Sequence, residues 1–253
     1  MIWKVVGAIA PGTSHLESSL PCQDRYLTTE FTSGDGGAVL ALAVSDGAGS
    51  AERSETGATT VCSTLIACTR DALAVSSDLD QIGDELVRSW FIDARAAIRI
   101  LARDEDGAIN DYAATGLLAV VADHQALCAQ VGDGAMVIRG RDANFTVAIW
   151  PEGGEYANET FFVTDPNVAT RVHVRRFDGV RDVIAFSDGL QRLALHSATK
   201  SAYAPFFEQI VRTVRDEERT VDDLMNDLTA YLGSAMVNAR TDDDKSLVIG
   251  CRL

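Results

Sequence analysis

Short apolar runs recur along the chain and predict the strands of a β-sheet fold. The runs are mostly rich in Val, Ile, Leu and Ala, and they fall into an early, a middle and a late group. The predicted strands cover residues 2–10, 25–32, 38–45, 115–122, 126–138, 144–149, 171–177, 181–187 and 246–252.

Helical spacing of apolar residues predicts two long helices between these groups. The first covers residues 52–74 with Ser50 as its predicted N-cap, and it repeats apolar or small residues at Ala58, Val61, Leu65 and Cys68. The second covers residues 79–103, and its apolar stripe comprises Leu86, Trp90, Ala94, Ala97, Ile98 and Leu101. Two further helices are predicted over residues 203–215 and 219–237.

The order of these elements indicates an α+β fold. Helices come in two blocks and do not alternate regularly with strands, so a doubly wound parallel fold is disfavoured. We therefore expect mostly antiparallel sheets with helices on their outer faces. No Pro/Ser-rich linker or low-complexity stretch divides the sequence, which favours a single domain over residues 1–253.

The chain is acidic, with 37 acidic against 22 basic side chains and a formal net charge of −15 over 253 residues. Nucleic acids and anionic membranes would be repelled by this charge, so neither is an expected partner. The charge suits a protein that holds cations. A hydrophobic content of 47% is enough for a sizeable core.

Cysteine usage and the N-terminus favour a cytoplasmic protein. The five cysteines show no CxxC spacing, so neither a disulfide framework nor a structural zinc site is indicated. The N-terminus lacks the sustained apolar core of a signal peptide, and no apolar run approaches the ~20 residues that span a bilayer.

Asp-Gly steps stand where three of the apolar runs stop, namely Asp46-Gly47, Asp133-Gly134 and Asp188-Gly189. A fourth acidic group, residues 242–244, precedes the last predicted strand. Each step delivers a carboxylate at a strand end, and Gly lets the backbone turn sharply behind it. Hard divalent cations such as Mg²⁺ and Mn²⁺ prefer oxygen ligands, so folding that gathers these carboxylates would create a metal site.

The order of the motifs carries a resemblance to a known family. The chain contains PGTSHLESSLPCQD, VSDGAGS, ATGLLAVV, VGDGAMV, FSDG and DDDKS in that order. This order resembles the metal-dependent Ser/Thr protein phosphatases of the PPM (type 2C) class over roughly residues 7–250, and most closely a compact bacterial subgroup of stand-alone enzymes. The resemblance implies a four-layer αββα sandwich of two antiparallel sheets flanked by helices.

The resemblance also implies roles for residues at the first metal. In this family the Asp of the first Asp-Gly step bridges two ions and the following Gly offers its backbone carbonyl, and Asp46 and Gly47 match these positions. The Asp of FSDG and the first Asp of a closing Asp-x-x-Thr/Ser motif complete the shell. They correspond to Asp188 and Asp243, with Ser246 at the Thr/Ser place and Asp242 and Asp244 as register alternatives.

Two more carboxylates have expected metal roles by resemblance. Asp24 of CQD corresponds to a residue beside the second ion that acts mainly through coordinated water, although it could also cap a turn. Asp133 corresponds to the residue associated with a third, weaker ion. An ordinary hairpin turn is the alternative for Asp133, because it lies between two plausible strands and single Asp-Gly dipeptides usually form turns.

The resemblance implies hydrolysis of phosphoserine and phosphothreonine by a metal-activated water at a binuclear Mn²⁺ or Mg²⁺ centre. No covalent phosphoenzyme is needed. The chain agrees with this, because Cys22 is followed by Gln23 and Asp24 and not by a phosphate-cradling Gly/Arg loop. The implied partners are a phosphorylated protein substrate and a cognate Ser/Thr kinase.

The chain departs from many relatives at several positions. Gln23 stands where many eukaryotic members have Glu, and Ala48 replaces a His proposed as general acid. His15 is the candidate that would either donate the missing proton or bind the substrate phosphate. Arg192 takes a place where relatives often have an acidic third-metal ligand, so it would oppose a third ion, contact phosphate or simply pair with a surface acid.

The segment from 150 to 181 is short for the substrate-facing flap of the family. A reduced flap-like insertion is expected there, built around Pro151, Gly153, Gly154, Glu155, Tyr156 and Asn158. Two other functions remain open at this stage. The departures at Gln23 and Ala48 are compatible with a non-catalytic phosphatase-like module that binds a phosphoprotein or kinase. A phosphatase for a small metabolite is a weaker alternative.

Overall fold

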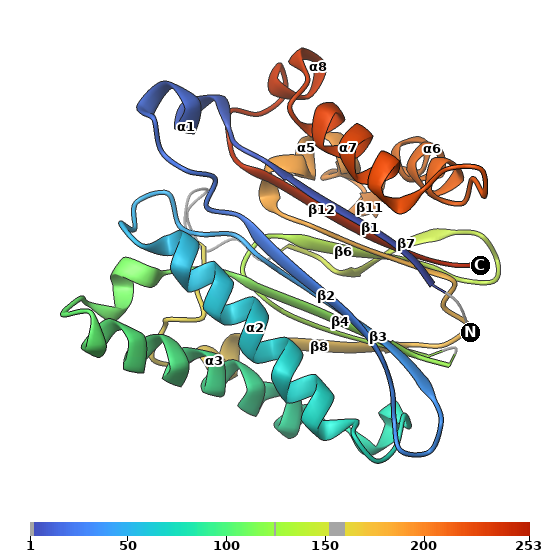
Figure 1. The fold of residues 1–253 in the computed structure, drawn as a ribbon, viewed down its shortest axis with the longest axis horizontal. Helices are drawn as coiled ribbons and strands as arrows, with labels where there is room; N and C mark the ends of the chain where they lie inside the picture. The colour runs from blue at the N-terminus through green and yellow to red at the C-terminus, as the bar shows by residue number, and fades with distance from the viewer. Residues whose placement is uncertain (1–2, 124, 152–159) are drawn as a thin grey trace.

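A computed structural model of the chain describes residues 3–123, 125–151 and 160–253. Two five-stranded antiparallel sheets lie face to face (Figure 1). Sheet I has the strand order β1-β12-β9-β6-β7, made by Trp3–Ala10, Lys245–Arg252, Asp182–Phe186, Ala135–Arg139 and Phe145–Ile149. Sheet II has the order β2-β3-β4-β5-β8, made by Arg25–Thr32, Ala38–Ser45, Gly116–Ala122, Gln125–Val131 and His173–Phe177.

Helices cover the outer face of each sheet (Figure 1). The long helices α2 (Ser54–Ala72) and α3 (Asp84–Asp104) pack on sheet II, whereas α6 (Ala204–Val214) and α7 (Val221–Leu232) pack on sheet I. This arrangement confirms the predicted four-layer αββα sandwich. The remaining short elements are α1 (Thr13–Ser18), η1 (Leu79–Gln81), η2 (Ile109–Tyr112), α4 (Val168–Arg171), η3 (Asp188–Leu190), α5 (Gln191–Ala194), β10 (Leu195–His196), β11 (Ser201–Ala202) and α8 (Ala235–Asn238).

Both faces of the central strands are buried, which explains their continuous apolar sequences. In β3, Val39, Ala41 and Ala43 face the core under α2 and α3, while the alternate residues Leu40 and Leu42 face the core between the sheets. A third core lies between sheet I and helices α6 and α7. The three apolar layers hold the strand ends of both sheets in fixed relation to one another.

The helix boundaries differ from the predictions where local backbone chemistry intervenes. Helix α2 begins at Ser54 after Arg53, which makes no side-chain cap, so the prediction of a start at residue 52 capped by Ser50 is wrong. The predicted helix 79–103 divides at Gly83 into the short 3₁₀ turn η1 and α3. Its apolar stripe also begins later than predicted, because Leu86 is exposed whereas Val87 and Trp90 are buried.

Two other predicted elements are also divided. The predicted helix 219–237 stops at Leu232, and after Gly233 the side chain of Ser234 caps the separate turn α8. The apolar segment 126–138 forms two strands, β5 and β6, which belong to different sheets. The hairpin alternative for Asp133 is therefore wrong, because the chain crosses from sheet II to sheet I at this point.

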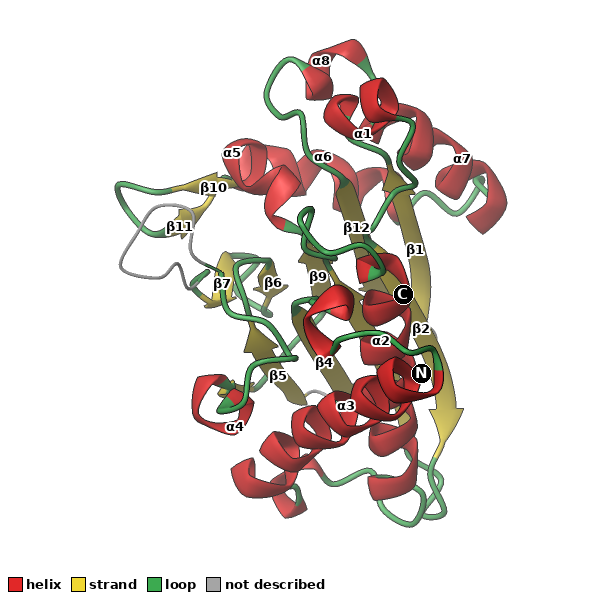
Figure 2. Cartoon of the chain, turned by 90° about the vertical axis from the view of Figure 1, so that its left-hand side faces the viewer, coloured by secondary structure: helices red, strands yellow, loops and turns green. Residues whose placement is uncertain are grey.

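Strands β3 and β9 finish at the same end of the sandwich. Figure 2 looks onto this end, where the connecting loops gather in front of the two sheets. None of the helices among the described residues has the length and apolar content needed to cross a membrane. The prediction of one domain over residues 1–253 stays a prediction. Residues 152–159, which hold most of the expected flap, lie outside the described residues.

Candidate metal centre

Asp46 stands directly after β3, and its backbone is fixed against the start of β4. The Asp46 main chain is hydrogen-bonded in both directions to Thr115, and Gly47 forms an isolated bridge with Ala114. Gly47 is needed for close packing, since an added Cβ would lie 2.8 Å from Ser54 Cβ. The strand end thus presents the carboxylate of Asp46 from sheet II.

Asp188 comes from the other sheet, where it follows β9 and opens the turn η3. The next residue, Gly189, packs directly on the closing acidic motif, since an added Cβ would lie 2.1 Å from the backbone oxygen of Asp244. The Oδ1 atom of Asp188 is buried and has no hydrogen-bond partner among the described residues. A buried, unpartnered carboxylate oxygen is costly unless a cation or a proton neutralises it.

Asp133 lies on the crossover between β5 and β6, where Gly132 has a positive φ of 102°. Thr160 Oγ1 donates to Asp133 Oδ2 over 2.6 Å, and the Gln191 side chain donates to the Asp133 backbone oxygen. These contacts orient the carboxyl group of Asp133 toward the other two strand ends.

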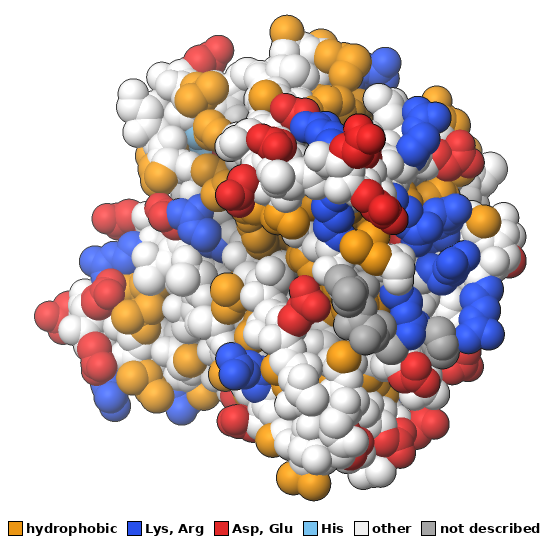
Figure 3. Space-filling model, turned by 45° about the vertical axis from the view of Figure 1, so that its right-hand side comes forward, with side chains coloured by type: hydrophobic (Ala, Val, Ile, Leu, Met, Phe, Trp, Pro, Cys, Tyr) orange, Lys and Arg blue, Asp and Glu red, His pale blue; other side chains and the backbone are white. Residues whose placement is uncertain are grey.

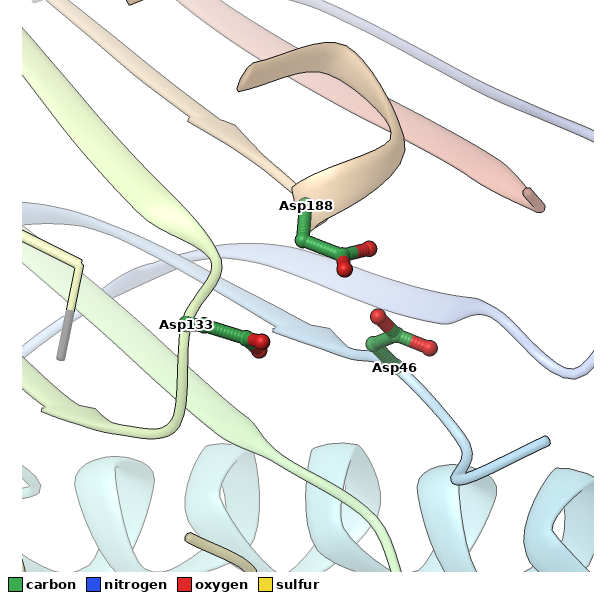
Figure 4. A group of neighbouring side chains, drawn as sticks. All are labelled: Asp46, Asp133 and Asp188. Carbon is green, nitrogen blue, oxygen red and sulfur yellow. The ribbon is translucent and has the colours of Figure 1, made fainter. Parts of the chain in front are cut away.

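The carboxyl groups of Asp46, Asp133 and Asp188 converge on one point (Figure 4). Each offers one oxygen, and the three oxygens all lie within 4.8 Å of one another. Residues from three distant parts of the sequence therefore share one small volume, as the Asp-Gly steps predict.

Asp24 and Asp243 surround this group. Asp24 is fully buried beside Asp46, and neither of its carboxylate oxygens has a well-formed hydrogen bond among the described residues, although the hydroxyls of Ser187 and Ser246 lie nearby. Asp243 is exposed and lines a cavity of about 440 Å³ together with Asp133 and Asp188.

Burial and mutual repulsion raise the pKa values of these carboxyl groups. Desolvation, followed by the charges of Asp133 and Asp243, raises the pKa of Asp188 to about 7. Desolvation raises the pKa of Asp24 to about 6, partly offset by neighbouring hydrogen-bonding groups. The pKa of Asp46 is well above its ordinary value because of desolvation and the nearby Asp24 and Asp188. Desolvation likewise raises the pKa of Asp133 and of Asp243.

This donor set fits a divalent cation. All of the side chains that converge are carboxylates, which are the ligands that Mg²⁺ and Mn²⁺ prefer. The unpartnered oxygens of Asp24 and Asp188, together with the raised pKa values of Asp46 and Asp188, indicate that the protein groups alone do not compensate the charge of the ionised carboxylates. A divalent ion would supply the missing positive charge.

The three consecutive aspartates of the closing motif have different surroundings. Asp242 and Asp243 line the cavity, whereas Asp244 is buried and accepts hydrogen bonds from the backbone of Gly12 and Gln23 and from His15. Of the three registers, Asp243 is the one whose charge acts on Asp46, Asp133 and Asp188.

His15 and Arg192 have different surroundings. His15, in α1, is 8% exposed, and its Nδ1 atom lies 2.8 Å from Asp244 Oδ2. Arg192, in α5, is exposed on the wall of the cavity, and no ion pair holds it within the described part of the chain. Gln23 is buried, and its Oε1 atom has no partner among the described residues.

Sequence patterns missed the residues that hold the carboxylates in place. Thr115, Thr160 and Gln191 are ordinary polar residues in the sequence, and only the fold brings them to Asp46 and Asp133. Ser187 could have been found from the sequence, because it stands next to Asp188 in the FSDG motif. The contacts of Asp244 with Gly12, His15 and Gln23 could not be predicted, because the sequence does not distinguish three consecutive aspartates.

Known proteins share this sequence pattern. The sequence profile described as protein phosphatase 2C matches residues 11–233. The chain is also 32% identical over 256 residues to serine/threonine-protein phosphatase 3 of Escherichia coli (strain K12), with 98% of each chain covered. The chain belongs to the protein phosphatase 2C family.

Solved structures agree on the fold of this phosphatase. The serine/threonine phosphatase Stp1 from Staphylococcus aureus superposes with a TM-score of 0.62 at 15% identity, covering 100% of this chain and 96% of the other. The S. agalactiae serine/threonine phosphatase gives a TM-score of 0.60 at 14% identity, with 100% of both chains covered.

Family membership confirms the predicted activity. The chain is a metal-dependent Ser/Thr protein phosphatase, and its acidic cluster is compatible with the divalent metal on which the family depends. The alternative of a non-catalytic binding module loses its support, since Asp46, Asp133 and Asp188 are present and converge.

Proposed function

We propose that this phosphatase uses two Mn²⁺ or Mg²⁺ ions to hydrolyse phosphoserine and phosphothreonine on proteins. The convergence of three carboxylate oxygens within 4.8 Å, at strand ends from both sheets, carries this proposal. Asp46, the Gly47 carbonyl, Asp188 and Asp243 would hold the first ion, with Asp46 shared. Asp24 would serve the second.

The chemistry follows from these assignments. Bound divalent ions would neutralise the phosphoryl oxygens and make a water acidic enough to attack phosphorus at neutral pH. The protein's part is to hold the carboxylates in place before substrate arrives, through the buried backbone contacts of Asp46 and the packed turn after Asp188. Arg192, exposed on the cavity wall, would pair with a substrate phosphate oxygen.

A third, weaker ion is proposed at Asp133. Its carboxyl group lies within reach of Asp46 and Asp188, which supports a shared ion. Arg192 lines the same cavity and acts against it, because a guanidinium competes with a cation for the same carboxylates. Removal of the positive charge by Arg192→Gln should then strengthen binding of the weakest ion.

The setting of the enzyme is proposed from its chemistry. All five cysteines are free, which supports work in the reducing cytoplasm. A phosphoprotein substrate implies a Ser/Thr kinase that makes it, and we propose such a kinase as the functional counterpart.

Hydrolysis of p-nitrophenyl phosphate and of a phosphothreonine peptide tests the proposal. The protein is stripped with EDTA and then assayed with Mn²⁺ or Mg²⁺ added back. Asp46→Asn should abolish the restored activity, whereas Asp104→Asn, which alters an exposed acid on α3, should leave it unchanged. Full activity of Asp46→Asn would overturn the assignment of Asp46 to the metal site. Full activity of the EDTA-stripped wild type without added metal would overturn the metal-dependent mechanism.

A further inference from the structure

Asp244 holds the N-terminal segment at three points. Gly12 N–H donates to Oδ1 over 2.6 Å, while Oδ2 accepts from Gln23 N–H over 2.5 Å and lies 2.8 Å from His15 Nδ1. The side chain of Asp244 is 2% exposed, so these contacts are protected from water. Asp244 thereby fastens both ends and the middle of segment 12–23.

Other contacts tie the same two segments together. Ser14 donates from both N–H and Oγ to the Asp242 backbone oxygen, over 3.1 and 2.7 Å. The buried Lys245 ammonium donates to the Pro11 backbone oxygen over 3.1 Å. Gly12 has no room for a side chain, since an added Cβ would lie 2.2 Å from the Asp242 backbone oxygen.

This junction lies one residue away from two carboxylates of the metal centre. Asp24 follows Gln23, and Asp243 precedes Asp244. A shift of the junction would therefore move a carboxylate of the second ion and one of the first ion together. Outer contacts of this kind commonly set metal affinity, because they fix where the ligands stand.

We propose that His15 and Asp244 are positioning residues that set Asp24 and Asp243 for metal binding, an inference that rests on the proposed function. His15 acts here by donating a hydrogen bond from Nδ1 to a buried carboxylate, and not by transferring a proton to the leaving group. Its contribution should therefore be reproduced by any side chain that donates from the same place.

Asparagine provides that replacement. Its amide nitrogen stands at about the same distance from Cβ as Nδ1 of histidine and donates a hydrogen bond, but it cannot titrate. We would compare His15→Asn and His15→Ala with the wild type, and use His196→Ala as a matched control on an exposed histidine of β10. Asp244→Asn tests the acceptor side of the same contact.

Calorimetric titration of the EDTA-stripped proteins with Mn²⁺ gives a readout that needs no turnover. His15→Ala and Asp244→Asn should weaken Mn²⁺ binding by roughly 10–100-fold. His15→Asn should stay within about threefold of the wild type, as should His196→Ala. At saturating Mn²⁺, kcat for p-nitrophenyl phosphate should recover in His15→Ala, because the substrate-facing chemistry is intact.

Three outcomes would overturn the proposal. They are unchanged Mn²⁺ binding in both His15→Ala and Asp244→Asn, a low kcat at saturating Mn²⁺ in His15→Ala, or the failure of His15→Asn to rescue binding. Failure of the proposed phosphatase function would give a different result from failure of this positioning role. The wild type would then bind Mn²⁺ and show the same variant pattern without hydrolysing the phosphate esters.

A separate observation concerns the opposite end of sheet I. A surface hollow of about 450 Å³ is lined by Arg141, Arg181, Arg252 and Leu253. Figure 3 shows Lys and Arg side chains gathered on this side of the molecule. Arg252 is paired with Asp123, whereas Arg141 and Arg181 are exposed and have no ion pair within the described part of the chain.

Unpaired guanidinium groups are unexpected in a chain with a net charge of −15. A guanidinium presents a planar fork of N–H groups that binds the two oxygens of a carboxylate, or of a phosphate, through paired hydrogen bonds. One exposed ion pair contributes little, so a single small anion would be held weakly, whereas a ligand with several carboxylates engages the whole cluster. We infer that this face docks an acidic segment of a partner protein.

Docking here leaves the metal centre open. Arg141 follows β6 and Arg181 precedes β9, whereas Asp133 and Asp188 stand at the other ends of these five-residue strands. At ~3.4 Å per residue a five-residue strand is roughly 17 Å long, so the two places are separated by at least about this length. A bound acidic segment would therefore change the capture of a protein partner and not the chemistry on a small ester.

Fluorescence anisotropy with a labelled octaglutamate peptide tests this surface. Binding should be lost in Arg141→Glu/Arg181→Glu and kept in a matched control, Arg99→Glu/Arg240→Glu, which reverses two exposed arginines elsewhere. High salt should weaken the binding, and turnover of p-nitrophenyl phosphate should be unchanged. Equal loss in both double variants, no binding by the wild type, or binding of inorganic phosphate without the peptide would overturn the inference.

Discussion

Asp46 and Thr115 are joined by two reciprocal hydrogen bonds. Asp46 N–H donates to Thr115 Oγ1 over 2.9 Å, and Thr115 N–H donates to the Asp46 backbone oxygen over 2.8 Å. Ser45 Oγ also donates to the Thr115 backbone oxygen over 2.6 Å. The backbone that carries the central carboxylate is thus held on both sides of its Cα atom.

Thr115→Val should lower both the stability of the fold and the Mn²⁺ affinity of the site, although Thr115 offers no carboxylate itself. The substitution keeps the shape of this buried side chain but removes the acceptor of Asp46 N–H, which should cost about 1–3 kcal/mol of unfolding free energy. Mn²⁺ affinity should also fall, because Asp46 is less firmly held. Urea unfolding and Mn²⁺ titration measure both effects. Thr115→Ser keeps the hydroxyl, so a loss as large as that of Thr115→Val would contradict the explanation.

The metal-free protein should lose stability as pH rises. An unfolded Asp titrates near ~4, whereas the folded pKa values of Asp24 and Asp188 are about 6 and about 7. The folded chain therefore keeps protons that the unfolded chain releases. This stabilisation is complete below pH ~4 and is lost as pH rises through the folded pKa values.

Asp188→Asn should remove part of this pH dependence, because an amide cannot ionise. In EDTA at pH 8 the variant should be more stable than the wild type by roughly 1–3 kcal/mol, and the difference should shrink toward pH 4. Urea unfolding at several pH values, with Asp104→Asn as an exposed control, measures this. A variant that is less stable than the wild type at pH 8 would exclude repulsion as the dominant cost.

Gly189→Ala should separate the turn after β9 from the closing motif. Its Cβ would stand 2.1 Å from the Asp244 backbone oxygen, so two packed backbones must move apart, at a cost of at least about 1–3 kcal/mol. Activity should fall with stability, since Asp188 and Asp243 sit on these segments. Gly49→Ala is the matched control, because nothing lies within 4 Å of its added Cβ. Similar melting temperatures for the two variants would refute the packing argument.

Thiol reagents should not inhibit the enzyme quickly. Desolvation raises the pKa of Cys22 and Cys62, with Asp24 adding to the effect, and it raises the pKa of Cys128 to about 12. The reactive thiolate is therefore scarce at neutral pH. Iodoacetamide at pH 7.5 should leave Mn²⁺-dependent activity nearly constant over an hour, and Cys22→Ser should turn over normally. Rapid inactivation would point to a thiol in the reaction.

The fold could be predicted where burial dominates the sequence pattern. The predicted strands 25–32 and 38–45 coincide with β2 and β3. Strand β3 is a continuous buried apolar run, which is a strong signal, whereas β2 (RYLTTEFT) is only partly buried and is indicated by its Thr, Tyr and Phe residues. The helix ends were less predictable, because Gly83 and Gly233 end helical segments that continue in the apolar pattern. Which sheet receives a strand depends on packing across the whole chain, so the assignment of the strands on either side of Asp133 to different sheets was not visible locally.

The same limit applies to the site. Asp46, Asp133 and Asp188 could be chosen from sequence because each stands at a strand end beside a Gly, and the structure brings them together. The residues that hold them could not be chosen, since Thr115 and Thr160 meet their partners only through long-range contacts. Asp244 illustrates the point most clearly. Asp242, Asp243 and Asp244 are identical in sequence, and they differ only in the surroundings that the fold gives each side chain.

The crossover at Asp133 links activity to the completeness of folding. Asp46 belongs to one sheet, Asp188 to the other, and Asp133 to the strand-to-strand passage between them. A chain in which only one sheet has formed brings together only part of this carboxylate cluster, however native that sheet is. The acidic cluster therefore exists only in a molecule whose two sheets have both formed and packed, so a misassembled chain lacks the site.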